Sequence, residues 1–319
     1  MRVAVTDHTF PELDIERAIL REAGVEMVSG QCRTEEELVP LVADADAVIT
    51  QFAPVRAGVI AAMRKARSIV RYGIGVDNVD LDAARGRGIP VCNVPDYCIA
   101  EVADHTLSFI LALTRQVVVH SNRVHQAAWG LGTPLASLKA LSDMTVGVIG
   151  FGRIGRAVVR RLTAFGGRVL VHDPVADAAD VVAAGAVPAD SGQVFADSDC
   201  VTLHCPSTAQ TRGMVNRQAI AAMRDGALLV NLSRGDLVDP AALVEALDSG
   251  KLSGAALDVF SPEPIPAGHP ILKRDNVILA PHIASASVPA VGRLRRAAAS
   301  LALASLRGEA LGSVVNGVR

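Results

Sequence analysis

Residues 145–155 read TVGVIGFGRIG, and this segment constrains the fold more than any other part of the 319-residue chain. Residues 145–149 are rich in β-branched side chains, as is typical of a buried strand, and the apolar spacing over 153–165 predicts an amphipathic helix. Gly166 and Gly167 end that helix, and a second strand-like run follows at 168–172. The segment therefore predicts a strand, a glycine-rich turn and a helix leading to a parallel neighbouring strand.

The three glycines of this turn have separate expected roles in binding a dinucleotide. Gly150 permits a tight turn, Gly152 leaves room for a pyrophosphate beside the backbone, and Gly155 lets the helix pack closely on the sheet. The first helical residues, Arg153 and Ile154, bring N–H groups to the positive end of the helix dipole. The alternative is an ordinary tight turn without a ligand.

Asp173 ends the strand 168–172 and is expected to bind the ribose hydroxyls of the adenosine. A carboxylate repels a 2′-phosphate, and the following Pro174 and Val175 bring no positive charge. The sequence therefore predicts NAD as the cofactor rather than NADP. In the alternative interpretation Asp173 only caps a helix.

Strand-like and helix-like segments alternate in two stretches of the chain, which indicates an α/β protein with parallel sheets covered by helices. Strands are expected first at 2–6, 25–28, 47–50, 68–71 and 90–93, and then at 145–149, 168–172, 199–203, 227–231, 254–257 and 277–279. Residues 99–125 are predicted to form one long helix between the two stretches. The length of the chain is also typical of two domains.

Three polar residues follow predicted strands of the second stretch, at the end of a parallel sheet where ligands bind. Arg234 lies in NLSRG after 227–231, Glu263 in DVFSPEP after 254–257, and His282 in PHIA after 277–279. Removing a hydride from an alcohol requires a base for the hydroxyl proton, and a histidine paired with a carboxylate supplies one. An arginine fork pairs with a substrate carboxylate. Taken singly, the three residues are also compatible with a surface ion pair, a loop acid and a strand-end hydrogen bond.

Composition excludes several classes of function. The formal net charge of −2 argues against electrostatic binding to nucleic acid or to an anionic membrane. The N-terminus, MRVAVTD, lacks the pattern of a signal peptide, and no long apolar run is suited to a membrane, so a cytoplasmic location is expected. The five cysteines lack the spacing of metal ligands, and no metal is expected.

Together, GFGRIG with HDP, NLSRGDLVD, GAALDVFSPEP and APHIA resemble the D-isomer-specific 2-hydroxyacid dehydrogenase family. YGIGVDNVDLDAARGRGIPVCNVP, at 72–95, is similar to the substrate-loop region of that family. The resemblance covers nearly the whole chain and is strongest to members related to phosphoglycerate dehydrogenase and to the C-terminal-binding proteins. It implies reversible hydride transfer between NAD and C2 of a small 2-hydroxy or 2-keto acid.

The resemblance also implies two Rossmann-like, doubly wound lobes of parallel sheet with a cleft between them. Residues 1–97 and 288–319 would form a discontinuous substrate-binding lobe, and residues 98–287 the NAD-binding lobe. Homodimers would form through the NAD-binding lobe, with an arm at 120–143 reaching across.

Further site residues are carried over from the family. Arg234 and the backbone N–H groups of Ile74 and Gly75 would bind the substrate carboxylate, His282 would be the acid–base group, and Glu263 its partner. The remaining residues implied to lie along the cofactor are Thr106, Cys205, Pro206, Asn231, Ser233, Asp258 and Ala284.

Two departures from the family bear on the substrate. Phosphoglycerate-specific members hold the phosphate with an arginine where this chain has Gln51, and Arg56 is the nearest positive charge. C-terminal-binding proteins have a tryptophan soon after the catalytic histidine, whereas this chain has Ser285 and Ser287. An NAD(H)-sensing corepressor and a phosphoglycerate dehydrogenase both remain as alternative functions. The absence of the arginine at position 51 favours the hypothesis of an unphosphorylated substrate.

Overall fold

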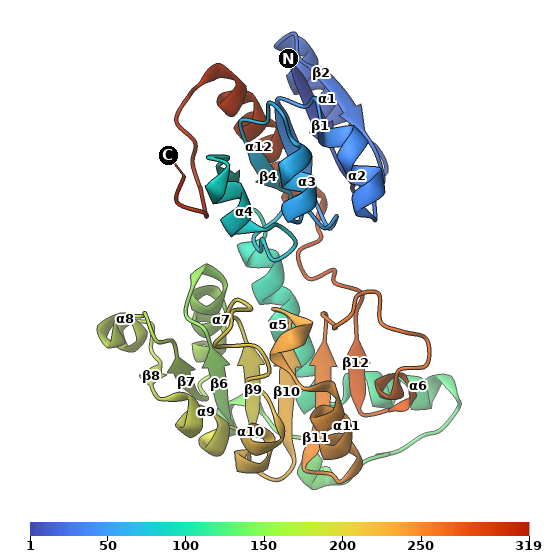
Figure 1. Cartoon of the computed structure of the whole chain (residues 1–319). Coiled ribbons are helices and arrows are strands. Elements are labelled where there is room, and N and C mark those ends of the chain that lie inside the picture. Colours follow the sequence, from blue (N-terminus) through green and yellow to red (C-terminus); the bar gives the residue numbers. More distant parts are fainter. Residues whose placement is uncertain (319) are drawn as a thin grey trace. The chain divides into compact units, whose positions relative to one another are not determined.

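The computed structural model describes residues 1–318 and divides the chain into two compact units. Unit 1 comprises Met1–Tyr97 together with the segment that begins at Ser287, so both ends of the chain belong to it (Figure 1). Unit 2 comprises Cys98–Ala286. Each unit contains one parallel sheet with its own helices, as the alternating sequence pattern predicts.

Unit 1 is built on a five-stranded parallel sheet in the order β2-β1-β3-β4-β5. Its strands are β1 (Arg2–Val5), β2 (Glu26–Ser29), β3 (Ala47–Thr50), β4 (Ile69–Arg71) and β5 (Val91–Cys92). Its helices are α1 (Asp14–Glu22), α2 (Glu35–Val42), α3 (Ala57–Ala62), α4 (Leu81–Gly86) and α12 (Val288–Arg307). All four residues of β3 are buried, which is typical of a strand covered on both faces.

Helix α12 begins and ends at residues suited to those positions. The Ser287 side chain accepts a hydrogen bond from the N–H of Ala290 at 3.0 Å, and Pro289 occupies the first turn. Gly308 ends the helix in the left-handed conformation, with φ +71°. These residues define the two ends of a single helix, which packs against the sheet of unit 1.

Unit 2 is built on a seven-stranded parallel sheet in the order β12-β11-β10-β9-β6-β7-β8. Its strands are β6 (Thr145–Ile149), β7 (Arg168–His172), β8 (Val187–Pro188), β9 (Cys200–Leu203), β10 (Ala227–Asn231), β11 (Leu252–Leu257) and β12 (Val277–Leu279). Its main helices are α5 (Ile99–Thr114), α6 (Val117–His125), α7 (Arg153–Thr163), α8 (Ala178–Ala183), α9 (Ser191–Asp197), α10 (Arg217–Ala222) and α11 (Pro240–Asp248). The strand order reverses between β6 and β9, and ligands of such sheets bind at the carboxyl ends beside this point.

The single long helix predicted for residues 99–125 is wrong. The structure has two helices, α5 and α6, bent by 64° at a break where Gln116 adopts a left-handed conformation with φ +47°. Hydrophobic periodicity continues across one such residue, so the sequence pattern does not detect the break. No single helix among residues 1–318 is long and apolar enough to cross a membrane; the bent pair α5 and α6 meets that test by length and composition only.

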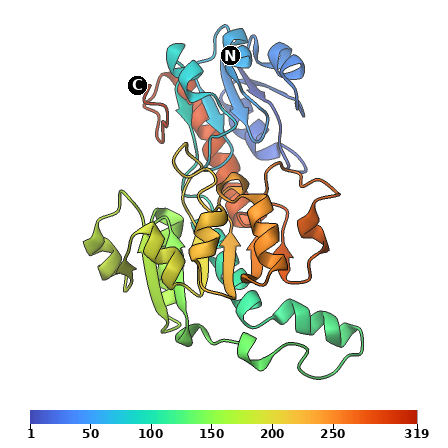
Figure 2. The ribbon, with the colours of Figure 1, turned by 60° about the horizontal axis from the view of Figure 1, so that its bottom comes forward.

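Helix α6 and the segment after it project from the side of unit 2 (Figure 2). No residue of α6 is buried, and Trp129 is 90% exposed. Large apolar side chains are exposed along the whole projection: Val117, Val118, Val124, Trp129, Leu131 and Leu135.

Candidate active site

The glycine turn between β6 and α7 has the geometry that the sequence predicts for each glycine. Gly150 has φ +100°, and a Cβ there would lie 2.6 Å from the carbonyl carbon of His204. A Cβ on Gly155 would lie 2.0 Å from the backbone oxygen of Gly150, so the helix packs against the turn without a side chain. A Cβ on Gly152 would meet nothing within 4 Å, which leaves open space beside the backbone.

The first turn of α7 presents donors to that open space. No side chain caps the helix at Gly152, and no acidic residue lies in its first turn. The N–H groups of Arg153 and Ile154 have no acceptor among residues 1–318. A helix start of this kind binds phosphate through its N–H groups and dipole. The turn therefore has the space and the donors that a dinucleotide pyrophosphate requires.

Asp173 lies at the end of β7, beside the glycine turn. Its carboxylate accepts hydrogen bonds from the N–H of Phe151 at 2.6 Å and from the N–H of Val175 at 2.9 Å. Carboxylate oxygens retain further acceptor capacity, so this side chain can also bind ribose hydroxyls. Val175 is 91% exposed and brings no positive charge that could bind a 2′-phosphate.

The loop after β9 approaches the turn from the other side. The N–H of His204 donates to the backbone oxygen of Ile149 at 2.7 Å, and desolvation lowers the pKa of this histidine to about 3. Cys205 is half-buried, and burial raises the pKa of its thiol to about 11. Pro206 is exposed. This edge of the site therefore carries neutral groups, suitable for an adenine ring.

Asn231 holds the turn that carries Arg234. The Asn231 side chain donates to the backbone oxygen of Arg234 at 2.8 Å and accepts from the N–H of Ser233 at 3.0 Å. The Ser233 hydroxyl donates to the backbone oxygen of Cys205. One guanidinium nitrogen of Arg234 lies 2.7 Å from the Ser233 backbone oxygen. Asn231 and Ser233, which the resemblance places along the cofactor, therefore also hold the turn that carries Arg234.

Asp258 supports the loop that carries His282. It is fully buried, and its two carboxylate oxygens accept from the N–H groups of Ile283 and Ala284, both at 2.8 Å. Its backbone oxygen accepts from the N–H of His282 at 2.8 Å. His282 has φ +54°, a conformation that costs a non-glycine residue free energy and occurs often at functional sites. Asp258, which the family resemblance places along the cofactor, thus has a second role that the sequence does not reveal: it supports the loop of His282.

His282 and Glu263 are in direct contact, as the sequence predicts. His282 Nδ1 lies 2.7 Å from Glu263 Oε2, and the N–H of Phe260 donates to Glu263 Oε1 at 2.8 Å. Burial acts to raise the pKa of Glu263, but the hydrogen bond and charge of His282, the Phe260 N–H and the charge of Arg234 outweigh it and lower that pKa. The three predicted catalytic residues therefore form one electrostatic group within unit 2.

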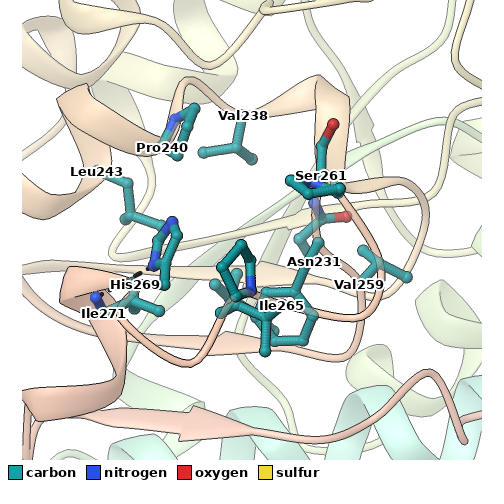
Figure 3. Close-up of a pocket in the computed structure, with 14 residues that line it drawn as sticks. Asn231, Val238, Pro240, Leu243, Val259, Ser261, Ile265, His269 and Ile271 are labelled. Carbon is teal, nitrogen blue, oxygen red and sulfur yellow. Dashed lines mark hydrogen bonds between the residues drawn. The ribbon is translucent and has the colours of Figure 1, made fainter.

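A small apolar pocket lies behind the segment that carries Glu263 (Figure 3). Val238, Pro240 and Leu243 line one side of it, and Val259 and Ile265 line the loop side. Beside this pocket Gly235 packs directly on the loop: a Cβ there would lie 2.0 Å from the backbone carbonyl carbon of Phe260. No pattern in the sequence indicates this contact, because it joins backbone to backbone.

In unit 1 the loop after β4 presents the predicted substrate donors. No acceptor for the N–H of Ile74 or Gly75 is found among residues 1–318, whereas the Asn93 side chain donates to the backbone oxygen of Ile74 at 2.6 Å. Gln51 is 7% exposed and its amide is bonded to Thr9: the side-chain oxygen accepts the Thr9 N–H at 2.7 Å. The amide therefore ties two loops together.

The structure also shows the surroundings of Arg56, the positive charge nearest to Gln51 in the sequence, and of Thr106, a residue predicted to lie along the cofactor. Arg56 donates to the backbone oxygen of Asp77 at 3.0 Å, on the surface of unit 1. Thr106 is fully buried in α5, where its hydroxyl donates to the Val102 backbone oxygen at 2.8 Å. Its approach to the nicotinamide stays a prediction. Within the described part of the chain, no group of three His, Cys, Asp or Glu side chains could hold a metal ion.

Comparison with known proteins identifies the family. The model of the D-isomer specific 2-hydroxyacid dehydrogenase NAD-binding domain matches residues 107–284, more than half of the chain. The chain belongs to the D-isomer-specific 2-hydroxyacid dehydrogenase family. It is therefore an NAD-dependent oxidoreductase that acts on 2-hydroxy acids.

Relatives of this dehydrogenase include enzymes with different names. A glyoxylate reductase of Korarchaeum cryptofilum is 37% identical over 89% of this chain and 86% of the reductase. A D-3-phosphoglycerate dehydrogenase of Mycobacterium tuberculosis is 34% identical over 88% of this chain, which spans only 53% of that enzyme's length. The crystal structure of a D-lactate dehydrogenase from Aquifex aeolicus, complexed with NAD and lactic acid, is 28% identical, with a TM-score of 0.87 and 96% of each chain covered.

Proposed function

We propose that this dehydrogenase reversibly reduces a small, unphosphorylated 2-keto acid to the D-2-hydroxy acid with NADH. The observation that carries the proposal is the 2.7 Å contact between His282 and Glu263, with the charge of Arg234 acting on the same carboxylate. An acid–base histidine and an arginine fork are the groups that reduction of a 2-keto acid requires.

Each of the three residues has one role in the proposed reaction. In the oxidation direction His282 Nε2 takes the hydroxyl proton while the C2 hydride leaves the substrate, and in reduction it returns that proton to the carbonyl oxygen. Glu263, hydrogen-bonded to Nδ1, holds the ring and stabilises its protonated form. Arg234 binds the substrate carboxylate and orients C2.

Bound NAD supplies the hydride acceptor of this chemistry, and its reduced form the donor. Gly150, Gly152 and Gly155 would hold the pyrophosphate at the start of α7, and Asp173 would bind the adenosine ribose. The open space at Gly152 and the donors of the first helical turn support this assignment. Unit 2, corresponding to the predicted lobe of residues 98–287, would be the NAD-binding lobe.

Residues 1–97 and 288–319 would form the substrate-binding lobe, with the N–H groups of Ile74 and Gly75 on the substrate carboxylate. The amides that lack acceptors support this role. A phosphate is disfavoured because Gln51 is neutral and its side chain is bonded to Thr9. The glyoxylate reductase relative, aligned over most of its length, supports a small keto acid as the substrate.

We further propose a cytoplasmic homodimer that forms through unit 2. The exposed apolar side chains along α6 and the following segment support such an interface, because a monomer would leave them in water. Light scattering should report a dimer for the wild type. Replacing Trp129 and Leu135 together by serine should give monomers without unfolding unit 2, and an unchanged mass would contradict this interface.

The central test is a panel of 2-keto acids followed by NADH absorbance. Glyoxylate, pyruvate, longer aliphatic and aromatic keto acids and a phosphorylated keto acid are compared at one enzyme concentration. His282→Ala should lose turnover with every acid, by about 10²- to 10⁴-fold, while NADH binding measured by fluorescence persists. Wild-type turnover in that variant would show that His282 is not the acid–base group.

A further inference from the structure

A buried ion pair joins the first and last helices of unit 1. The Arg295 guanidinium of α12 lies 2.7 Å from Glu16 Oε2 and 2.6 Å from Asp14 Oδ1, both on α1. Glu16 is fully buried and Arg295 is 7% exposed. A buried pair of this kind is weak evidence for a stabilising role, since apolar residues often serve as well.

Tyr72 is hydrogen-bonded to the same ion pair. Its hydroxyl donates to Glu16 Oε1 at 2.9 Å, and only 1% of the residue is exposed. Burial and the nearby charge of Glu16 raise the pKa of Tyr72, so the hydroxyl keeps the proton that it donates. The tyrosine ring also packs edge-on against Phe10, with ring centroids 5.3 Å apart, and Phe10 lies under the guanidinium of Arg295.

Tyr72 directly precedes the loop that presents the predicted substrate donors. Its N–H donates to the Thr50 backbone oxygen at 2.8 Å, at the end of the pairing between β3 and β4. The chain then turns at Gly73, with φ +142°, and the Gly73 backbone oxygen accepts the N–H of Val94 at 2.9 Å. The direction of the N–H groups of Ile74 and Gly75 therefore depends on how Tyr72 is held.

We propose that Tyr72, anchored by the Glu16–Arg295 ion pair, is a positioning residue for the N–H groups of Ile74 and Gly75 that bind the substrate carboxylate. The inference rests on the proposed function for the role of those N–H groups. Packing alone would need only an aromatic ring at position 72, whereas fixing the ring at both ends needs the hydroxyl. Phenylalanine at this position would keep the contact with Phe10 and lose the link to Glu16.

The test compares Tyr72→Phe with Ser68→Ala. Ser68 immediately precedes β4, the strand that Tyr72 follows, and it is fully buried. Its hydroxyl has no partner within the described chain, so Ser68→Ala deletes a buried hydroxyl away from the loop. Tyr72→Phe should raise KM for glyoxylate or pyruvate about fivefold, the factor expected for one ordinary hydrogen bond, with kcat and NADH affinity within about twofold of wild type. Ser68→Ala should leave KM unchanged.

Hydrogen exchange provides a readout that does not depend on turnover. In Tyr72→Phe, exchange of the N–H groups at positions 72, 73 and 94 should accelerate relative to Ser68→Ala, because those bonds hold the loop. If hydrogen exchange in Tyr72→Phe is unchanged, the inference is overturned. A lower Tm does not rescue it when exchange and KM stay as in wild type. Faster exchange with an unchanged KM would support the positioning of the loop and overturn the assignment of Ile74 and Gly75 to the substrate.

Discussion

Glu263 accepts two hydrogen bonds from different directions, one from His282 Nδ1 at 2.7 Å and one from the N–H of Phe260 at 2.8 Å. The second bond fixes the carboxylate on its own loop, and the first fixes the histidine ring relative to that carboxylate. The orientation of His282 is thus determined by the loop after β11 as well as by its own backbone. The same arrangement places a negative charge where a protonated ring needs one.

Glu263→Gln should separate orientation from charge. A glutamine can still accept the Phe260 N–H, but its amide would donate to His282 Nδ1, which places the proton of the neutral ring on Nε2. Oxidation of the hydroxy acid requires an unprotonated Nε2, so kcat/KM for oxidation should fall about 10- to 100-fold. The pH above which keto-acid reduction declines should also move lower. An unchanged pH profile would contradict the role of the carboxylate.

Glu263 should also contribute a pH-dependent part of the stability. The pKa of Glu263 is lowered in the folded protein from its ordinary value of 4.5. Its contribution to stability is therefore present above that ordinary value and is lost as the pH falls through the folded-state pKa. Wild type should therefore have a larger free energy of unfolding than Glu263→Gln, and this difference should be greater at pH 7 than near pH 3. Glu245→Gln, which breaks an exposed ion pair with Arg217, is the control and should show little such change.

Asp173→Ala tests the cofactor preference. Loss of the carboxylate removes the acceptor for ribose hydroxyls and for the Phe151 N–H, and it also removes the charge that repels a 2′-phosphate. NADH affinity should fall about tenfold, and the ratio of kcat/KM for NADH over NADPH should decrease. Asp177→Ala, four residues on, removes only a helix cap and should keep the ratio. An unchanged ratio in Asp173→Ala would show that other residues select the cofactor.

The glycine turn and the positions of the proposed catalytic residues could be predicted because their signals are local. A glycine that must avoid a backbone atom, such as Gly155 against Gly150, leaves a fixed spacing in the sequence. Arg234, Glu263 and His282 each follow a strand, and parallel strands bring such positions to one edge of the sheet. Neither inference required knowledge of how the side chains pack.

The features that sequence reasoning missed depend on single backbone conformations or on contacts between distant segments. The left-handed residue Gln116 breaks a helix whose apolar pattern continues across it. His282 takes φ +54° because Asp258 accepts the N–H groups around it, which no pattern within either loop reveals. The helix α9 (Ser191–Asp197) is a miss of another kind: it is too short for a clear hydrophobic period, and the local signal is its N-cap Asp190, whose side chain accepts the Gln193 N–H at 2.7 Å.

Gly235→Ala tests whether the support of the catalytic loops matters for activity. The added Cβ would lie 2.0 Å from the Phe260 carbonyl carbon, so either the turn that carries Arg234 or the loop that carries Glu263 must move. Overpacking against backbone should cost about 1–3 kcal/mol in the free energy of unfolding. A shift of about 1 Å at the catalytic groups should lower kcat/KM roughly 100-fold. Gly268→Ala is the matched control, since a Cβ there meets nothing within 4 Å, and it should keep both stability and turnover. Equal kinetics in the two variants would mean that the contact between Gly235 and Phe260 does not set the geometry of the site.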